Sequence, residues 1–217
     1  MGRALASAER TVVVGASVRR REDPRLLTGA GRYVADLTLP GCLHAVVVRS
    51  PHAHARLRAI DTAAARRHPG VHLVVTAADL GPVPRIPIRL GDRPELRRFL
   101  QPSLAQDRVR YVGEPVALVV ADDRYAAEDA ADLVAVDYEP LPPVPDVEAA
   151  LRPDAPLLHP EAGTNLAERL LFRRGDPEGV AATAPVRLRR RLSVQRHTGV
   201  PLETRGLLAA PDPTARL

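Results

Sequence analysis

The stretch VALVVADDRYAAEDAADLVAVDY, residues 116–138, decides the fold class of this 217-residue chain. It begins with a continuous apolar run, which is typical of a strand that has neighbours on both sides in a sheet. Asp122 or Asp123 then provides an N-cap for a helix over residues 124–133. One face of that helix is apolar and consists of Ala126, Ala127, Ala130 and Leu133. Residues 134–138 return to a strand pattern, so the stretch predicts a strand–helix–strand unit.

A second unit of the same kind precedes it in the chain. Residues 55–60 alternate between apolar and charged side chains, which predicts a strand with Leu57 and Ala59 on its apolar face. A short helix over residues 63–67 follows and ends before a Pro-Gly pair, which is a strong helix stop. Residues 71–76 (VHLVVT) then predict another buried strand.

Three more segments complete the predicted domain. A short strand is expected over residues 33–36, and residues 43–49 (LHAVVVR) predict a strand that is buried on both faces. Residues 81–106 are interrupted by prolines and glycines and are expected to form a surface excursion. The strands and helices together predict an α/β (α+β) fold.

Changes in composition divide the chain into four segments. Residues 1–27 are expected to be an N-terminal extension, residues 28–146 the α/β domain, and residues 147–184 a linker. Residues 185–217 are expected to begin another domain with a strand over residues 185–195. Its apolar face would consist of Val186, Leu188, Leu192 and Val194, and its opposite face would carry Arg187, Arg189 and Arg191.

Composition excludes several classes of protein. The net charge is +5, but the arginines are interleaved with acidic residues and no aromatic–basic stacking pattern accompanies them, so no nucleic-acid partner is expected. Cys42 is the single cysteine, which excludes an internal disulfide framework. No apolar run is long enough for a secretory signal or a membrane span, so the expected location is the cytoplasm and no membrane contact is expected.

Five blocks of the chain carry a family resemblance, and they occur in the family's order. They are GAGRYVAD at 29–36, LHAVVVRSPHAHARLRAID at 43–61, VHLVVTAADL at 71–80, the segment from DRVRYVGEP to PDVEAA at 107–150, and QRHTGVPLETRG at 195–206. The first four resemble the a/b hammerhead domain of the xanthine dehydrogenase/aldehyde oxidase family. The last resembles the start of that family's molybdenum-cofactor domain. Within the family, the chain most resembles bacterial large subunits of the carbon monoxide dehydrogenase-like or aldehyde oxidase-like type.

The resemblance implies that the chain is the N-terminal part of a molybdopterin-binding large subunit, either truncated or one piece of a split gene. In the full complex such a subunit hydroxylates aldehydes or N-heterocycles and passes electrons to iron–sulfur and FAD subunits. The family's cofactor loops and its late catalytic Glu have no counterpart in these residues. We therefore expect no catalytic residue and no cofactor in this chain alone, and a structural role for it. The expected partners are the remainder of the large subunit and the iron–sulfur and FAD subunits.

The same resemblance implies three candidate cofactor contacts. Aligning on residues 202–204 (LET) places His197 where xanthine dehydrogenase-type members have a Gln beside the molybdenum. Glu203 and Arg205 would line the cofactor cleft or form a structural ion pair. The lone carboxylate of Glu114, in a Gly-Glu-Pro turn, is expected to be a solvated or hydrogen-bonded turn residue.

Two alternatives stay open. Cys42, His44, His52 and His54 form a Cys-x-His and a His-x-His pair, and residues two apart on a strand point the same way, so the four could bind zinc. They could equally be structural or surface residues, because the family pattern accommodates them without a metal. The second alternative is a stand-alone hammerhead module that recruits a partner through residues 185–196 and performs no catalysis.

Overall fold

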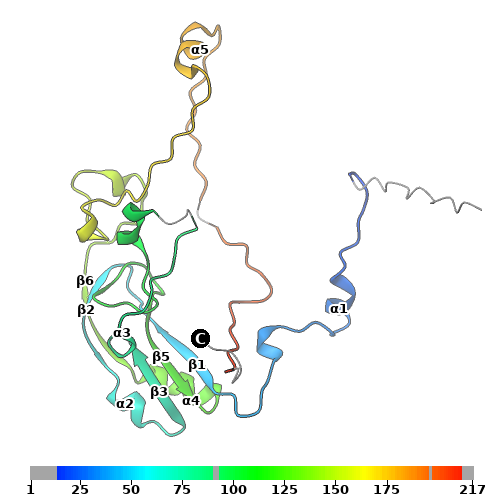
Figure 1. Cartoon of the computed structure of the whole chain (residues 1–217), viewed down its shortest axis with the longest axis vertical. Helices are drawn as coiled ribbons and strands as arrows, with labels where there is room; N and C mark the ends of the chain where they lie inside the picture. Colours follow the sequence, from blue (N-terminus) through cyan, green and yellow to red (C-terminus); the bar gives the residue numbers. More distant parts are fainter. Residues whose placement is uncertain (1–13, 90–92, 196, 212–217) are drawn as a thin grey trace, which may run out of the picture. The chain divides into compact units, whose positions relative to one another are not determined.

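The structure is a computed structural model that describes residues 14–89, 93–195 and 197–211 (Figure 1). It divides into two compact units, one formed by Gly41–Arg190 and the other by residues from 1–40 and 191–217. In the described residues, every named strand belongs to Gly41–Arg190. The four-segment division expected from composition remains a prediction.

The first sheet has the strand order β1-β5-β3. β5 (Pro115–Ala121) lies in the centre and pairs antiparallel with β1 (His44–Arg49) and with β3 (Val71–Thr76). Because β5 has a neighbour on each side, four of its residues are buried: Val116, Ala117, Val119 and Ala121. The prediction of a central strand at 116–121 is confirmed.

The second sheet has the order β4-β2-β6. β2 (Ala55–Asp61) lies between β4 (Arg108–Val109) and β6 (Ala135–Pro140), and both pairings are antiparallel. A bulge between Leu57 and Ala59 shifts the register of β2 against β6. As a result Ile60, and not Ala59, packs on the core, which corrects the strictly alternating face that the sequence predicted.

Two helices cover one face of the first sheet. α4 (Arg124–Asp132) contacts all three of its strands, and α2 (Ala63–Arg67) contacts β3 and α4. The carboxylate of Asp123 caps α4 by accepting the N–H of Ala126 at 2.9 Å, as the sequence predicted. The core beneath the helices consists of Ala65, Val74, Ala117, Val119, Ala130 and Val134.

A second core lies at the second sheet and is joined to the first. Its buried residues are Ala55, Ala105, Val109 and Val116. Val48 of β1 and Val136 of β6 pack against both clusters, so the two sheets share side chains where they meet. Ala105 also shows that residues 81–106 are not wholly a surface excursion. Leu96 of the 3₁₀ helix η2 (Pro94–Phe99) and Leu104 are buried there as well.

The mixed α/β fold class is confirmed, but consecutive strands pair differently from a simple strand–helix–strand unit. β2 and β3 flank α2 and belong to different sheets, and the same holds for β5 and β6 on either side of α4. Each helical connection therefore crosses from one sheet to the other. A short helix, α3 (Ala77–Leu80), follows β3 directly, as expected.

Three predicted strands differ from the structure. Residues 34–36 form the 3₁₀ helix η1 (Val34–Asp36), because the Asp36 carboxylate accepts the Tyr33 N–H at 2.9 Å and closes a tight turn. β1 forms, yet His44 and Ala45 are exposed, because an edge strand has one neighbour only. Residues 185–195 form no strand, since none of the ladders among the described residues includes them.

The remaining helices are short. α1 (Asp23–Leu27) precedes η1 in the smaller unit, whereas η3 (Ala149–Leu151), η4 (Pro160–Ala162) and α5 (Pro177–Thr183) follow the second sheet in Gly41–Arg190. None of the helices in the described ranges has the length and hydrophobicity that crossing a membrane requires.

We expect the substitution Val119→Ala to lower the free energy of unfolding by about 2 kcal/mol, because it removes two buried methyl groups and leaves a cavity under α4. Val147→Ala is the matched control: Val147 is 75% exposed, so its free energy of unfolding should change little. Urea unfolding followed by far-UV circular dichroism measures both. Equal effects of the two substitutions would contradict the assigned core.

Candidate functional site

The most unusual group in the fold is the carboxylate of Glu114, which is 1% exposed at the start of β5. It lies inside its own turn, where Oε2 accepts the backbone N–H of Arg110 and the Glu114 N–H donates to the Tyr111 carbonyl at 3.2 Å. Burial raises the pKa of Glu114, and the hydrogen bonds from the backbone of Arg110 and Tyr111 oppose that rise. The sequence indicated the turn but not the burial of the Glu114 side chain. The carboxylate accepts its hydrogen bond from a backbone N–H, and a backbone donor leaves no mark in the amino-acid sequence.

The Glu114 turn also fastens the end of β1. The Glu114 carbonyl accepts the Ser50 N–H at 3.0 Å, and the Ser50 carbonyl accepts the Gly113 N–H at 2.7 Å. The Arg49 guanidinium donates to the Gly113 carbonyl at 2.9 Å. Gly113 has φ +88°, a conformation that residues with a side chain rarely adopt. The turn therefore holds the β1 end and the β5 start together.

Arg110 extends this turn to a segment that we call the strap, residues 149–168. Its Nε donates to the Leu158 carbonyl at 2.9 Å, and Nη1 donates to the Arg108 carbonyl at 3.4 Å. Asp107 lies 3.7 Å from Nη2. Because its side chain is 13% exposed and its guanidinium is bonded on several sides, Arg110 acts as a structural clamp.

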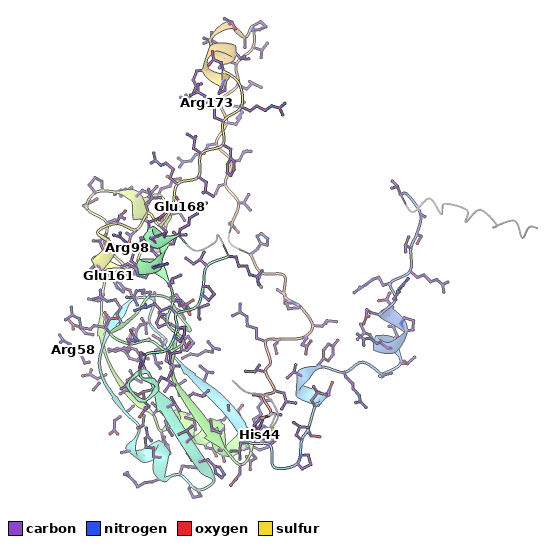
Figure 2. All side chains as sticks on the ribbon, viewed as in Figure 1. His44, Arg58, Arg98, Glu161, Glu168 and Arg173 are labelled. Carbon is purple, nitrogen blue, oxygen red and sulfur yellow. The ribbon has the colours of Figure 1, made fainter. Side chains whose placement is uncertain are left out.

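Other side chains hold the strap against η2. Arg93 pairs with Glu168 at 2.6 Å, and Arg98 donates to the Ala162 carbonyl at 3.5 Å (Figure 2). The rings of Phe99 and His159 meet edge-to-face with centroids 5.3 Å apart. Burial, followed by the charge of Arg110, lowers the pKa of His159. The first half of the segment expected to be a linker is thus fixed on the domain.

An amide closes the strap on itself. The Asn165 Nδ2 donates to the carbonyls of Pro156 at 2.8 Å and Ala150 at 3.2 Å, and its Oδ1 accepts the Leu158 N–H at 3.0 Å. One side chain therefore satisfies three backbone groups in a segment whose only regular elements are the short 3₁₀ helices η3 and η4, which explains how the strap keeps its form. No sequence signal in 149–168 had indicated this role.

The four candidate zinc ligands do not come together. Cys42 and His44 lie at the start of β1, whereas His52 and His54 lie beyond its end, and a six-residue strand separates the pairs by about 17–20 Å. The Cys42 thiol contacts its neighbour's carbonyl, and His52 packs on Tyr138 with ring centroids 4.7 Å apart. Among the described residues no group of three metal-ligating side chains is assembled.

His54 has a structural place of its own. It is 5% exposed, and its Nδ1 lies 2.8 Å from the Pro142 carbonyl, which accepts and thereby fixes the proton on Nδ1. The His54 carbonyl accepts the Leu141 N–H at 2.9 Å. Its Nε2 is buried without a hydrogen-bond partner in the described part of the chain. These contacts tie the end of β6 to the start of β2.

The three candidate cofactor contacts lie in the smaller unit and are exposed. Glu203 accepts the Val34 N–H at 2.8 Å, and the His197 Nδ1 lies 3.4 Å from the Gln195 carbonyl. The Glu203 carboxylate is therefore bonded to the start of η1, and no pocket among the described residues is lined by Glu203, His197 and Arg205 together. A molybdopterin dinucleotide needs converging donors for its phosphates and pterin, so these residues as arranged do not fit it.

A small pocket between α3 and the loop before β4 has a volume of about 20 Å³, which is room for a water molecule. Glu114 is enclosed by its own turn, so it has no route to a substrate. What the arrangement can do is hold two sheets and a strap in one shape.

The pH dependence of stability tests the Glu114 environment. Because the folded pKa is raised, this group stabilises the fold below the ordinary carboxyl value of 4.5, and that stabilisation is lost as pH rises through the folded value. We expect the free energy of unfolding of wild type minus that of Glu114→Gln to fall from pH 4 toward neutrality.

The measurement is urea unfolding at a series of pH values, and it includes two further variants. Glu114→Ala removes the acceptor of the Arg110 N–H and should cost about 1–3 kcal/mol at pH 4, with the same fall toward neutrality as for Glu114→Gln. Glu95→Gln, at an exposed position, is the matched control and should leave the pH profile parallel to wild type. A difference between wild type and Glu114→Gln that rises with pH would contradict the assignment.

Comparison with known proteins identifies the family. Residues 28–142 match the family described as aldehyde oxidase and xanthine dehydrogenase, a/b hammerhead domain. The 6-hydroxypseudooxynicotine dehydrogenase complex subunit gamma of Paenarthrobacter nicotinovorans is 42% identical over 98% of this chain and 27% of that protein. The carbon monoxide dehydrogenase large chain of Afipia carboxidovorans is 42% identical over 94% and 26%. The crystal structure of quinoline 2-oxidoreductase from Pseudomonas putida 86 superposes with a TM-score of 0.62 at 43% identity and covers 79% and 22%.

The chain spans about a quarter of the length of these relatives. The matched family covers the blocks within 28–142 that carried the resemblance, so that interpretation of the sequence is confirmed. The chain belongs to the aldehyde oxidase and xanthine dehydrogenase family, through the a/b hammerhead domain that its residues 28–142 match.

Proposed function

We propose that this chain is the N-terminal hammerhead section of a molybdenum hydroxylase large subunit and that its own role is structural. In the complete assembly, the molybdopterin-bearing part of the subunit would hydroxylate an aldehyde or an N-heterocycle. Iron–sulfur and FAD subunits would take up the electrons. The cytoplasm is the proposed location, because the single Cys42 needs no oxidising compartment.

One observation carries this proposal. The similarity is collinear over 98% of the chain, yet it accounts for 27% of the relative's length. The relatives are named as dehydrogenase subunits or large chains, including a xanthine dehydrogenase molybdenum-binding subunit of Escherichia coli. The described residues contribute packing, two cores and a fixed strap, and they assemble no group of three metal-ligating side chains. Chemistry would therefore come from other parts of the assembly.

The proposal extends to the organisation of the chain. Residues 28–146 would be the hammerhead domain, residues 1–27 an extension, and residues 147–184 the connection to a cofactor domain that begins in residues 185–217. Support comes from the position of the family match, which ends at residue 142. In that context His197, Glu203 and Arg205 would take their positions from the cofactor domain as a whole.

Expression with an affinity tag in two settings tests this role. Produced alone in a host that makes molybdopterin, the chain should contain no stoichiometric molybdenum by plasma mass spectrometry and should reduce no dye with aldehydes or N-heterocycles. Tagged in the cell that encodes it, the chain should co-purify with molybdenum and with sequences similar to the remaining three quarters of its relatives. Turnover by the isolated chain, or a tagged chain that brings no molybdenum, would refute the proposal.

A stand-alone scaffold is the second candidate, and the two joined cores within Gly41–Arg190 favour it, because such a unit can fold by itself. If this candidate holds, the isolated chain should be monodisperse and should melt in one cooperative transition in differential scanning calorimetry. Molybdenum co-purification in the encoding cell would then be absent, which separates the two candidates.

A further inference from the structure

A hairpin-like segment projects from Gly41–Arg190. We call it the tip hairpin, residues 169–190. Two extended arms lead to α5 and back from it (Figure 1). α5 caps the turn, where the Asp176 carboxylate accepts the Gly179 N–H at 3.2 Å. The arms themselves contain no strand and no β-bridge, so they contribute no ladder to either sheet.

The arms display large apolar side chains to solvent. Phe172 is 89% exposed, Leu171 85%, Leu188 80% and Val186 74%. On the returning arm, Val186 and Leu188 alternate with arginines, which is the pattern of a strand with one apolar face. An extended segment whose backbone N–H and C=O groups are in no ladder, and whose apolar side chains are exposed, can serve as a template for pairing with another strand.

The tip hairpin is also strongly basic. It has six arginines, all exposed, at positions 169, 173, 174, 187, 189 and 190, against two acidic residues, Asp176 and Glu178. Both acids lie beside Arg173, at 3.7 Å and 2.6 Å (Figure 2). The hairpin therefore carries a formal net charge of 6 − 2 = +4, and the charge outside the Arg173 cluster comes from arginines alone.

Charge and shape together select one kind of occupant. A second copy of this chain would bring an identical +4 hairpin, so like charges would oppose self-pairing. Nucleic acid would satisfy the arginines but would leave the apolar side chains between them uncovered. A protein strand that alternates acidic and apolar residues would cover both sets at once.

We propose that the tip hairpin binds an acidic, amphipathic edge strand of a protein partner, which pairs with residues 185–190 and covers Val186 and Leu188. Its carboxylates lie opposite Arg187 and Arg189. The inference rests on the proposed function in taking the partner from the same assembly, and it adds the chemistry of the contact. The pairing supplies the backbone partner whose absence prevents residues 185–190 from forming a strand.

A peptide binding assay on the full chain tests this contact. The probe is a fluorescein-labelled decapeptide of alternating Glu and Val, followed by fluorescence anisotropy at low and physiological salt. We expect saturable binding that weakens as salt rises. The double substitution Arg187→Glu with Arg189→Glu should weaken it tenfold or more, and Leu188→Ser should weaken it several-fold.

Matched controls carry the same chemical changes elsewhere. Arg67→Glu with Arg152→Glu reverses two exposed charges outside the hairpin, and Val147→Ser removes an exposed apolar side chain, so neither should alter binding. All variants are compared by circular dichroism, because loss of folding would reduce binding without informing on the contact.

Several outcomes would overturn the inference. They are the absence of binding, equal binding of an alternating Glu-Ser peptide, or tighter binding of single-stranded DNA that the same arginine substitutions abolish. A concentration-dependent dimer in sedimentation that the arginine substitutions disrupt would assign the surface to a second copy instead. None of these results bears on molybdenum co-purification, so failure of this inference is distinguishable from failure of the proposed function.

Discussion

The buried carboxylate of Glu114 is the constraint on which the arrangement of Gly41–Arg190 depends. It closes the turn that starts the central strand β5, and the backbone around it fastens the end of β1 through Ser50. The same turn presents Arg110 to the strap. An apolar residue at this position would leave the Arg110 N–H without its acceptor inside the protein. The fold therefore retains a group whose charge is disfavoured by burial, because the turn that its carboxylate closes joins β5 to the end of β1 and to the strap.

The elements that sequence predicted well are those with local signals. The apolar run of β5, the capping aspartate and the alanines on the inner face of α4 each depend on residues close in the chain, and all three are present. Leu133, predicted on the same face, lies just beyond the helix and is 44% exposed. Pairing is not local. Nothing in residues 55–76 shows that the strands flanking α2 join different sheets, and the bulge that brings Ile60 to the core has no marker in the sequence.

The candidate site was predicted less well, for reasons that differ between residues. Cys42, His44, His52 and His54 have metal-ligand spacing, but β1 keeps the two pairs at opposite ends. The sequence predicts that Glu114 is a turn residue. It does not predict that the side chain is buried, because the burial depends on neighbours from β1 and the strap. The alternation of 185–195 predicted a strand that the structure does not contain, because a strand also requires a partner to pair with. His197, Glu203 and Arg205 rest on resemblance, and their cofactor role remains a prediction.

The interleaving of the two sheets has a consequence for how the polypeptide acquires its shape. In chain order, the strands alternate between the two sheets from β1 to β6, so no single cut yields two fragments that each keep a whole sheet. During synthesis the first sheet lacks its centre until Ala121 has left the ribosome, and the second lacks an edge until Pro140 has. Folding must therefore wait for distant segments to meet, which favours one slow, cooperative step over stepwise growth from the N-terminus.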